Sequence, residues 1–163
     1  MTNTKIIFNK RPVGVPDSDC WRLETSQLPE ISDQEVLVKV EYISIDPAMR
    51  GWMNLGKSYI KPVEIGEVMR ALGVGQILES KNPKFKVGQF VTGAFGVQQY
   101  CAYAMPDLSI VDEKAMPLPV YLGTLGMSGL TAYFGILDTG QPKEGETVVV
   151  SGAAGAVGSV VGQ

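Results

Sequence analysis

The feature that most constrains the fold is a run of small residues directly after four strand-forming ones. Residues 147–150, T-V-V-V, form a continuous β-branched run, which is typical of a strand buried on both faces. The next segment, S-G-A-A-G-A-V-G at residues 151–158, has small residues at the spacing G-x-G-x-x-G, with Ala153 in place of the first glycine. Because a strand that turns tightly into a helix needs such residues, an α/β module is predicted to begin here.

The same turn predicts a bound dinucleotide. Small residues between a strand and a helix leave backbone N–H groups free to face a pyrophosphate, and the start of the helix favours negative charge. Gly155 would let the backbone approach the phosphates, and Gly158 would let the helix pack closely on its strand. The alternative that these residues leave open is a tight strand-to-helix turn without a ligand.

Before residue 120 the sequence predicts short strands separated by turns. Residues 36–43 alternate with the two-residue period of a half-buried strand. That strand is expected to stop at Asp46 and Pro47, because proline lacks a backbone donor and aspartate before it favours a turn. This pattern is typical of a small barrel or sandwich. Further strands are predicted at residues 72–79, 88–92 and 97–104.

After residue 120 apolar residues recur at helical spacing. Ser128 is expected to cap a helix that ends at Gly140. The predicted fold class is therefore mixed, with an all-β domain at residues 1–120 followed by the start of an α/β domain at residues 121–163. The apolar face of the helix is predicted to include Leu130, Tyr133, Phe134 and Leu137.

Composition and charge exclude several classes of protein. With 45% hydrophobic and 19% charged residues, the chain is expected to fold rather than stay disordered. A net charge of −3 without clustered basic residues predicts no nucleic-acid partner. Serines and glycines interrupt the longest apolar stretch, residues 148–162, so no membrane span is predicted. The apolar run at residues 6–8 is too short for a signal peptide, which predicts a cytoplasmic protein.

Three segments carry a resemblance to a known family. They are D-P-A-M-R-G at 46–51, L-G-M-S-G-L-T-A-Y at 125–133 and G-E-T-V-V-V-S-G-A-A-G-A-V-G-S at 145–159. Together they resemble the zinc-independent medium-chain dehydrogenase/reductase superfamily, in the group of prostaglandin, curcumin and alkenal double-bond reductases. The resemblance implies an N-terminal GroES-like, partly open barrel followed by the start of a Rossmann domain, with NADP(H) and substrate in the cleft between the two domains.

By position, the resemblance also implies which residues meet the cofactor and the substrate. Pro47, Met127 and Thr131 are expected near the nicotinamide end of NADP(H). Ala48 stands where relatives usually carry a tyrosine that lines the substrate pocket, and Tyr59 is also expected to face the substrate. No catalytic residue is assigned. The residues expected at the pyrophosphate are Ala154, Gly155, Ala156, Val157 and Gly158.

The residue types argue against a zinc site. Zinc-containing members of the superfamily need Cys and His ligands. This chain has no histidine, and its two cysteines, Cys20 and Cys101, are far apart in sequence. We therefore expect no zinc, and expect catalysis by positioning a hydride donor and an acceptor in a dry site.

The resemblance implies an enone or alkenal reductase of which this chain is the N-terminal half. Two alternatives stay open: a quinone reductase of the same superfamily, and a barrel module without catalytic activity. The chain by itself is expected to be inactive, because the residues that contact the ribose and adenine would follow Gln163. A homodimer is also expected, since dimers are common among such enzymes.

Overall fold

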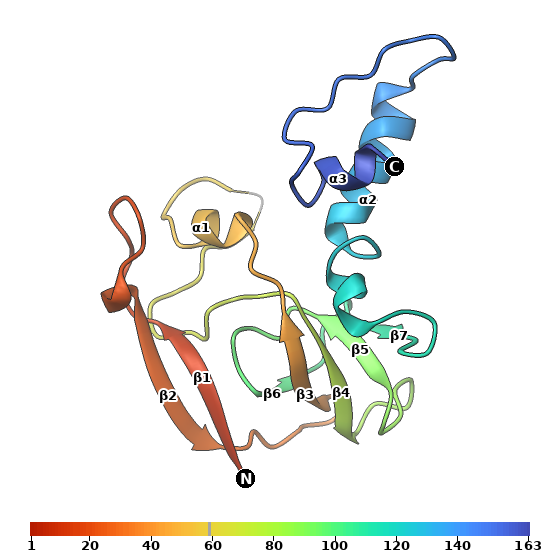
Figure 1. The fold of residues 1–163 in the computed structure, drawn as a ribbon. Coiled ribbons are helices and arrows are strands. Elements are labelled where there is room, and N and C mark those ends of the chain that lie inside the picture. Colours follow the sequence, from red (N-terminus) through yellow and green to blue (C-terminus); the bar gives the residue numbers. More distant parts are fainter. Residues whose placement is uncertain (59) are drawn as a thin grey trace. The chain divides into compact units, whose positions relative to one another are not determined.

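The chain forms two compact units, Met1–Asp112 and Glu113–Gln163, in a computed structural model that describes residues 1–58 and 60–163 (Figure 1). The first unit contains the strands and the second contains helical segments. The change of character predicted near residue 120 falls a few residues after this division. As a domain boundary, residue 120 stays a prediction.

The first unit contains two antiparallel sheets. Strand β3 (Val36–Ile43) lies where the alternating pattern predicts it, and it pairs with β4 (Gly73–Ser80) on one side and β6 (Tyr100–Tyr103) on the other. The five-stranded sheet has the order β6-β3-β4-β5-β7, where β5 is Phe90–Gly93 and β7 is Ser109–Val111. A second sheet joins β1 (Thr2–Phe8) to β2 (Trp21–Gln27), with the short helix η1 (Ser18–Cys20) before β2.

Residues 97–99 link the two sheets. The strand predicted at residues 97–104 is regular only over β6, but the residues before β6 make backbone hydrogen bonds to both sheets. Val40 N–H donates to Gln99 O at 2.8 Å in the larger sheet, and Gln99 N–H donates to Thr4 O at 3.0 Å in the smaller one. These bonds close one side of a partly open barrel.

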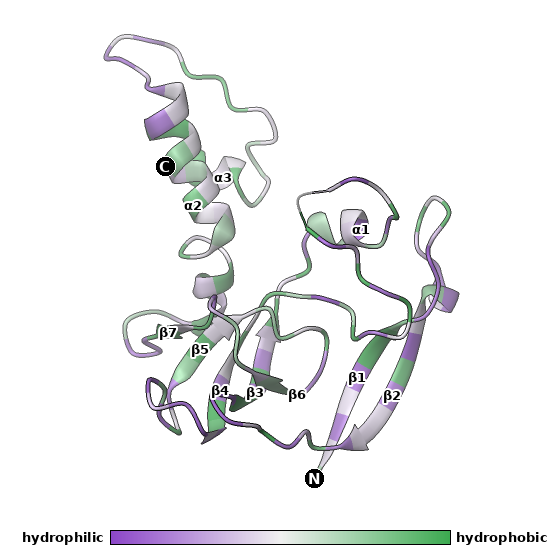
Figure 2. Ribbon diagram, turned by 180° about the vertical axis from the view of Figure 1, so that it is seen from behind, coloured by the Kyte–Doolittle hydropathy of each residue, from purple (hydrophilic) through white to green (hydrophobic). Residues whose placement is uncertain are grey.

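The barrel is filled by two apolar clusters. One lies against the larger sheet, and the other lies between β1 and α1 (Ala48–Trp52), the short helix after β3. The C-terminal part of β1, which contributes to this second cluster, is coloured as hydrophobic in Figure 2. The first cluster contains Val36, Val38, Ile77, Val91, Phe95, Cys101, Tyr103 and Leu108, and the second Phe8, Met49, Met53, Val63, Met69 and Ala71.

Gly75 allows β3 and β4 to approach closely beside an irregularity in their pairing. A Cβ atom at Gly75 would overlap the Lys39 carbonyl oxygen and lie 2.7 Å from Val38 Cγ1. Gly75→Ala should therefore lower the free energy of unfolding by about 1–3 kcal/mol, the usual cost of overpacking. Gly51→Ala is the matched control, because a Cβ atom there meets nothing within 4 Å and alanine favours the α1 helix.

Urea unfolding of the two variants tests this difference. We expect a lower midpoint for Gly75→Ala and an unchanged or higher one for Gly51→Ala. Equal midpoints would show that the β3–β4 pair can separate without cost.

The helix of the second unit begins and packs differently from the prediction. Ser128 does not cap it: α2 (Met127–Tyr133) has its N-cap two residues earlier, at Gly126, and no side chain caps it. The helix continues as a π-helical segment, η3 (Phe134–Gly140), which ends at Gly140 as predicted. Its buried residues are Gly129 and Ala132, and Gly129 lies so close to the Thr124 carbonyl that a Cβ atom would overlap it. The predicted apolar face is more than half exposed, at Leu130, Tyr133, Phe134 and Leu137.

The strand predicted at residues 147–150 is not formed. This segment has no regular secondary structure and pairs with no strand, and Val149 is 88% exposed. A strand needs neighbouring strands to accept and donate its backbone hydrogen bonds, and the described residues of the second unit contain none. The remaining helices are η2 (Leu118–Leu122) and α3 (Gly158–Val161). No helix in the described part of the chain is long and apolar enough to cross a membrane.

Candidate functional site

The first group of predicted site residues lies where β3 leads into α1. The Asp46 carbonyl accepts a hydrogen bond from Met49 N–H at 3.0 Å, which forms the predicted turn. Met49 is buried and anchors the helix in the second apolar cluster. Pro47 and Ala48 are exposed at the start of α1. The structure thus brings these two predicted residues together on an accessible surface.

Asp46 has an unsatisfied side-chain oxygen. Its Oδ2 atom is buried, and no hydrogen-bond partner for it exists among the described residues. Buried polar atoms are nearly always hydrogen-bonded, so a buried acceptor without a donor needs an explanation. Asp46 is next to Pro47, one of the residues expected near the cofactor. Its Oδ2 atom is therefore a candidate acceptor for an N–H or O–H group of a bound molecule. From the sequence, Asp46 is predicted only to form a turn. Residue types and their order do not show whether a side-chain oxygen has a hydrogen-bond donor in the folded protein.

Tyr59, the other predicted substrate residue, lies outside the described residues.

In the second unit, α2 brings two predicted cofactor residues together. Met127 and Thr131 lie one helical turn apart and are both exposed. The Thr131 hydroxyl donates to the Met127 carbonyl at 2.7 Å. Since its proton is used inside the helix, the Thr131 oxygen can only accept a hydrogen bond from a ligand while this contact lasts.

The glycine turn presents backbone donors. Gly155 N–H donates to the Gly152 carbonyl at 2.8 Å, whereas the described part of the chain supplies no acceptor for the N–H groups of Ala154, Ala156 and Val157. These three residues are exposed or nearly so, and Gly152 itself has a positive φ of 63°. Free amides of this kind can bind an anion such as a phosphate.

Gly158 has a steric role in the same turn. It is buried, and a Cβ atom on it would overlap the Gly152 carbonyl oxygen and lie 2.9 Å from Ala153 Cα. The sequence predicts that Gly158 allows close packing of the helix on its strand. In this structure the close neighbour is the turn itself, because the strand is not formed.

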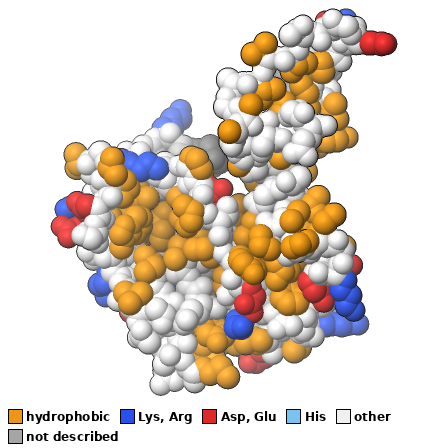
Figure 3. Space-filling view, viewed as in Figure 1, with side chains coloured by type: hydrophobic (Ala, Val, Ile, Leu, Met, Phe, Trp, Pro, Cys, Tyr) orange, Lys and Arg blue, Asp and Glu red, His pale blue; other side chains and the backbone are white. Residues whose placement is uncertain are grey.

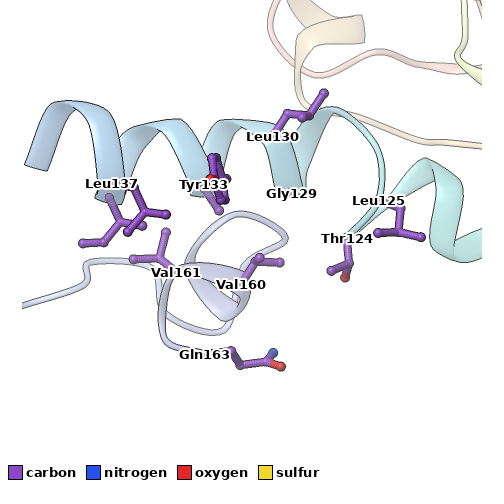
Figure 4. A pocket seen from close by; sticks show the side chains of 11 residues that line it. Thr124, Leu125, Gly129, Leu130, Tyr133, Leu137, Val160, Val161 and Gln163 are labelled. Carbon is purple, nitrogen blue, oxygen red and sulfur yellow. The ribbon is translucent and has the colours of Figure 1, made fainter. Parts of the chain in front are cut away.

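An apolar groove lies between α2 and α3 (Figure 4). It has a volume of about 490 Å³, and none of its lining residues is charged. Val161 points toward Leu137 across the groove. Its lining is mainly apolar, and Thr124, Tyr133 and Gln163 supply its polar side chains.

The described residues contain no group of three or more His, Cys, Asp or Glu side chains arranged to hold a metal ion. Both cysteines are buried and form no disulfide. Burial raises the pKa of the Cys101 thiol to about 12, so this group is neither a thiolate nor a nucleophile at neutral pH.

Comparison with known proteins identifies the class. Residues 4–111 match a family described as the N-terminal domain of oxidoreductase, and the chain belongs to this family. Within it, the chain belongs to the zinc-independent medium-chain dehydrogenase/reductase group and corresponds to the N-terminal half of its members. The predicted fold class, a GroES-like barrel followed by the start of a Rossmann domain, is confirmed by this likeness.

Particular relatives are similar along the whole chain. The NADPH-dependent curcumin reductase of Escherichia coli (strain K12) is 42% identical over 161 residues, which are 99% of this chain and 47% of that protein. Prostaglandin reductase 1 of Bos taurus is 41% identical over 96% of this chain and 46% of its own length. The crystal structure of CurA from Vibrio vulnificus in complex with NADPH matches with a TM-score of 0.90 and 42% identity, over 98% of this chain and 47% of that one. The chain therefore spans about half the length of the curated relatives it matches.

Proposed function

We propose that this chain is the N-terminal half of an NADPH-dependent oxidoreductase that reduces the carbon-carbon double bond of α,β-unsaturated ketones or aldehydes. The observation that carries the proposal is the likeness, over 98% of the chain and with a TM-score of 0.90, to CurA in complex with NADPH. The similarity to proteins named curcumin reductase and prostaglandin reductase supports the same reaction class.

The residues present fit a dinucleotide. The free amides of Ala154, Ala156 and Val157 suit pyrophosphate oxygens, and Gly155 and Gly158 keep bulky side chains out of the turn.

At the nicotinamide end, the proposed residues are Pro47, Met127 and Thr131. The orphaned Asp46 Oδ2 suits an amide or hydroxyl donor of the cofactor or the substrate. When bound, NADPH supplies the hydride that adds to the β-carbon of the acceptor, and a proton adds to the α-carbon.

This chain contributes binding and orientation to that reaction. Ala48 has the smallest side chain that could stand at the exposed start of α1 apart from glycine, so it leaves room for a substrate there. The chain has no histidine, so no imidazole in this half can move a proton. The residues proposed at the site can instead orient the cofactor and the substrate toward each other. Such orientation can lower a reaction barrier substantially.

Location and partners belong to the same proposal. The cytoplasmic location expected from the sequence fits a reductase that uses the NADPH of the cell, and its partner would be a small enone rather than a nucleic acid. The homodimer that the resemblance implies is also proposed for the full-length protein.

Consumption of NADPH with hexyl vinyl ketone, by the full-length protein and by this 163-residue chain, tests the proposal. We expect turnover by the full-length protein only, with a product that has gained two hydrogens and kept its carbonyl group. Turnover of quinones without turnover of the enone would favour a quinone reductase. No turnover of either class would favour a barrel without catalytic activity.

A further inference from the structure

The carboxylate of Asp46 is an acceptor that the fold does not use. Its Oδ2 atom is buried and has no hydrogen-bond partner among the described residues. A buried acceptor without a donor costs free energy, because the oxygen has lost its contact with water and gained no other contact. Such an atom indicates a donor that arrives from outside the described chain.

The turn at the start of α1 does not need this carboxylate. Met49 N–H donates to the Asp46 carbonyl at 3.0 Å, and Asp46 N–H contacts Met49 Sδ at 3.4 Å. An aspartate that forms a turn or caps a helix usually accepts a backbone N–H with a side-chain oxygen. Here no side chain caps α1. Backbone atoms and the buried Met49 side chain therefore hold the turn, and Asp46 Oδ2 stays available.

Two arginines near α1 are bound to other acceptors. Arg50 donates to the Gly14 carbonyl from Nη2 at 2.8 Å, and Arg11 Nη2 lies 3.2 Å from Glu64 Oε2. No ion pair within residues 1–58 and 60–163 involves Asp46. The charge of this carboxylate is thus as unmatched as its hydrogen-bonding capacity.

The surface beside Asp46 is apolar. Hydrophobic side chains gather on the face of the first unit around α1 (Figure 3). Ile45, directly before Asp46, is 75% exposed, and Pro47 and Ala48 are exposed after it. These side chains offer no donor to Oδ2. A ligand that covers them would shield a hydrogen bond to Oδ2 from water, which strengthens such a bond.

The chemistry of the reactants favours a donor on the cofactor. The carbonyl group of an enone accepts hydrogen bonds and donates none, so a carboxylate would repel its oxygen. NADPH carries several donors, but its ribose hydroxyls lie close to phosphates, whose negative charges also repel a carboxylate. The nicotinamide carboxamide is a neutral N–H donor away from the phosphates, and its ring becomes cationic when the hydride leaves. An unmatched carboxylate suits that end of the cofactor.

We propose that Asp46 binds NADPH by accepting a hydrogen bond at Oδ2 from the carboxamide N–H of the nicotinamide ring. This inference rests on the proposed function. It makes Asp46 a cofactor-binding residue that the free chain keeps at a cost in stability.

A cycle of two protein forms and two cofactors tests the contact in the full-length protein. The acetylpyridine analogue of NADPH has a methyl ketone in place of the carboxamide, so it keeps the carbonyl and lacks the N–H donor. Asp46→Ala should weaken NADPH binding about tenfold, the usual effect of one hydrogen bond to a charged group. Its affinity for the analogue should stay within about twofold of the wild type. Calorimetric titration measures all four dissociation constants.

The unfolding of the protein without cofactor separates this role from a structural one. Asp46→Ala should leave the urea midpoint unchanged or raise it, because the substitution removes an unpaired buried oxygen. Asp17→Ala is the matched control, since Asp17 Oδ1 accepts from Asp19 N–H at 3.1 Å and caps η1. That variant should lower the midpoint and leave the affinity for NADPH unchanged.

Asp46→Asn tests the importance of the charge. Asparagine keeps an acceptor oxygen of the same shape without the negative charge, so this variant should retain part of the preference for NADPH over the analogue.

The contact is overturned if Asp46→Ala leaves the affinity for NADPH unchanged, weakens both cofactors equally or lowers the urea midpoint as Asp17→Ala does. Reduction of hexyl vinyl ketone by the wild type is measured beside the titrations. Turnover without the selective loss of affinity would remove the contact and keep the enone reductase. The selective loss without turnover would keep the contact and remove the enone reductase.

Discussion

Gly158→Ala in the full-length protein should weaken NADPH binding by at least about tenfold, because a Cβ atom at residue 158 forces the backbone of the glycine turn to move. That Cβ atom would overlap the Gly152 carbonyl oxygen and lie 2.9 Å from Ala153 Cα. Both neighbours are backbone atoms, so relief requires a shift of the turn that presents the free amides of Ala154, Ala156 and Val157. Titration of the protein with NADPH, followed by fluorescence or calorimetry, measures the change.

Gly162→Ala is the matched control for this experiment. Gly162 lies at the end of the same helix, and a Cβ atom there would be 3.7 Å from the Gly158 carbonyl oxygen, an ordinary contact. The affinity of the Gly162→Ala variant for NADPH should match that of the wild type. Gly155→Ala, whose Cβ atom would lie 3.1 Å from the Gly152 carbonyl oxygen, should fall between the two. If all three variants bound NADPH equally well, the turn would not be the pyrophosphate site.

The second large effect is a loss of stability in alkaline solution. Burial raises the pKa of the Cys101 thiol from 9.0 to about 12. Burial also raises the pKa of Tyr103, and its hydrogen bond to Asp107 raises it further. Both groups are more easily deprotonated when unfolded. The contribution of Cys101 to stability is complete below pH 9.0 and is lost as the pH rises toward 12, whereas that of Tyr103 begins to fall only above pH 10.0. The free energy of unfolding should fall by a few kcal/mol, because each tenfold difference in acidity between the folded and unfolded chain corresponds to about 1.4 kcal/mol.

Urea midpoints measured from neutral to strongly alkaline pH test this expectation in the first unit. Cys101→Val keeps an apolar group in the same cluster and should flatten the decline that begins near pH 9.0. A midpoint that stayed constant to pH 12 would show that these groups become solvated without unfolding.

Tyr103→Phe adds a separate effect at neutral pH. The Tyr103 hydroxyl accepts from Ala94 N–H at 3.0 Å and donates to Asp107 at 2.8 Å. Its loss leaves the Ala94 N–H without this acceptor, which should cost about 1–3 kcal/mol. The variant should therefore be less stable at pH 7 but should lose less stability at high pH than the wild type.

Local patterns predicted the elements whose hydrogen-bond partners come from the same compact unit. The alternation at residues 36–43 corresponds to β3, since both neighbouring strands belong to the first unit. The β-branched run at residues 147–150 predicts a strand equally well, yet the segment is unpaired. Propensity describes what a segment favours, while a strand also needs a neighbour to bond.

Some features of the candidate site could likewise be predicted from the sequence, and others depend on the tertiary structure. The spacing of small residues alone was enough to indicate the glycine turn, and the lack of histidine led to the expectation of no zinc site. The reductase family was indicated by the resemblance of three segments to known members. Tertiary structure alone decided the orphaned Asp46 oxygen, the close approach at Gly75 and the Arg50 contact with Gly14. Each of these depends on atoms of segments that only folding brings together. Gly14 and Arg50, for example, are 36 positions apart in the sequence, and no local pattern records such a contact.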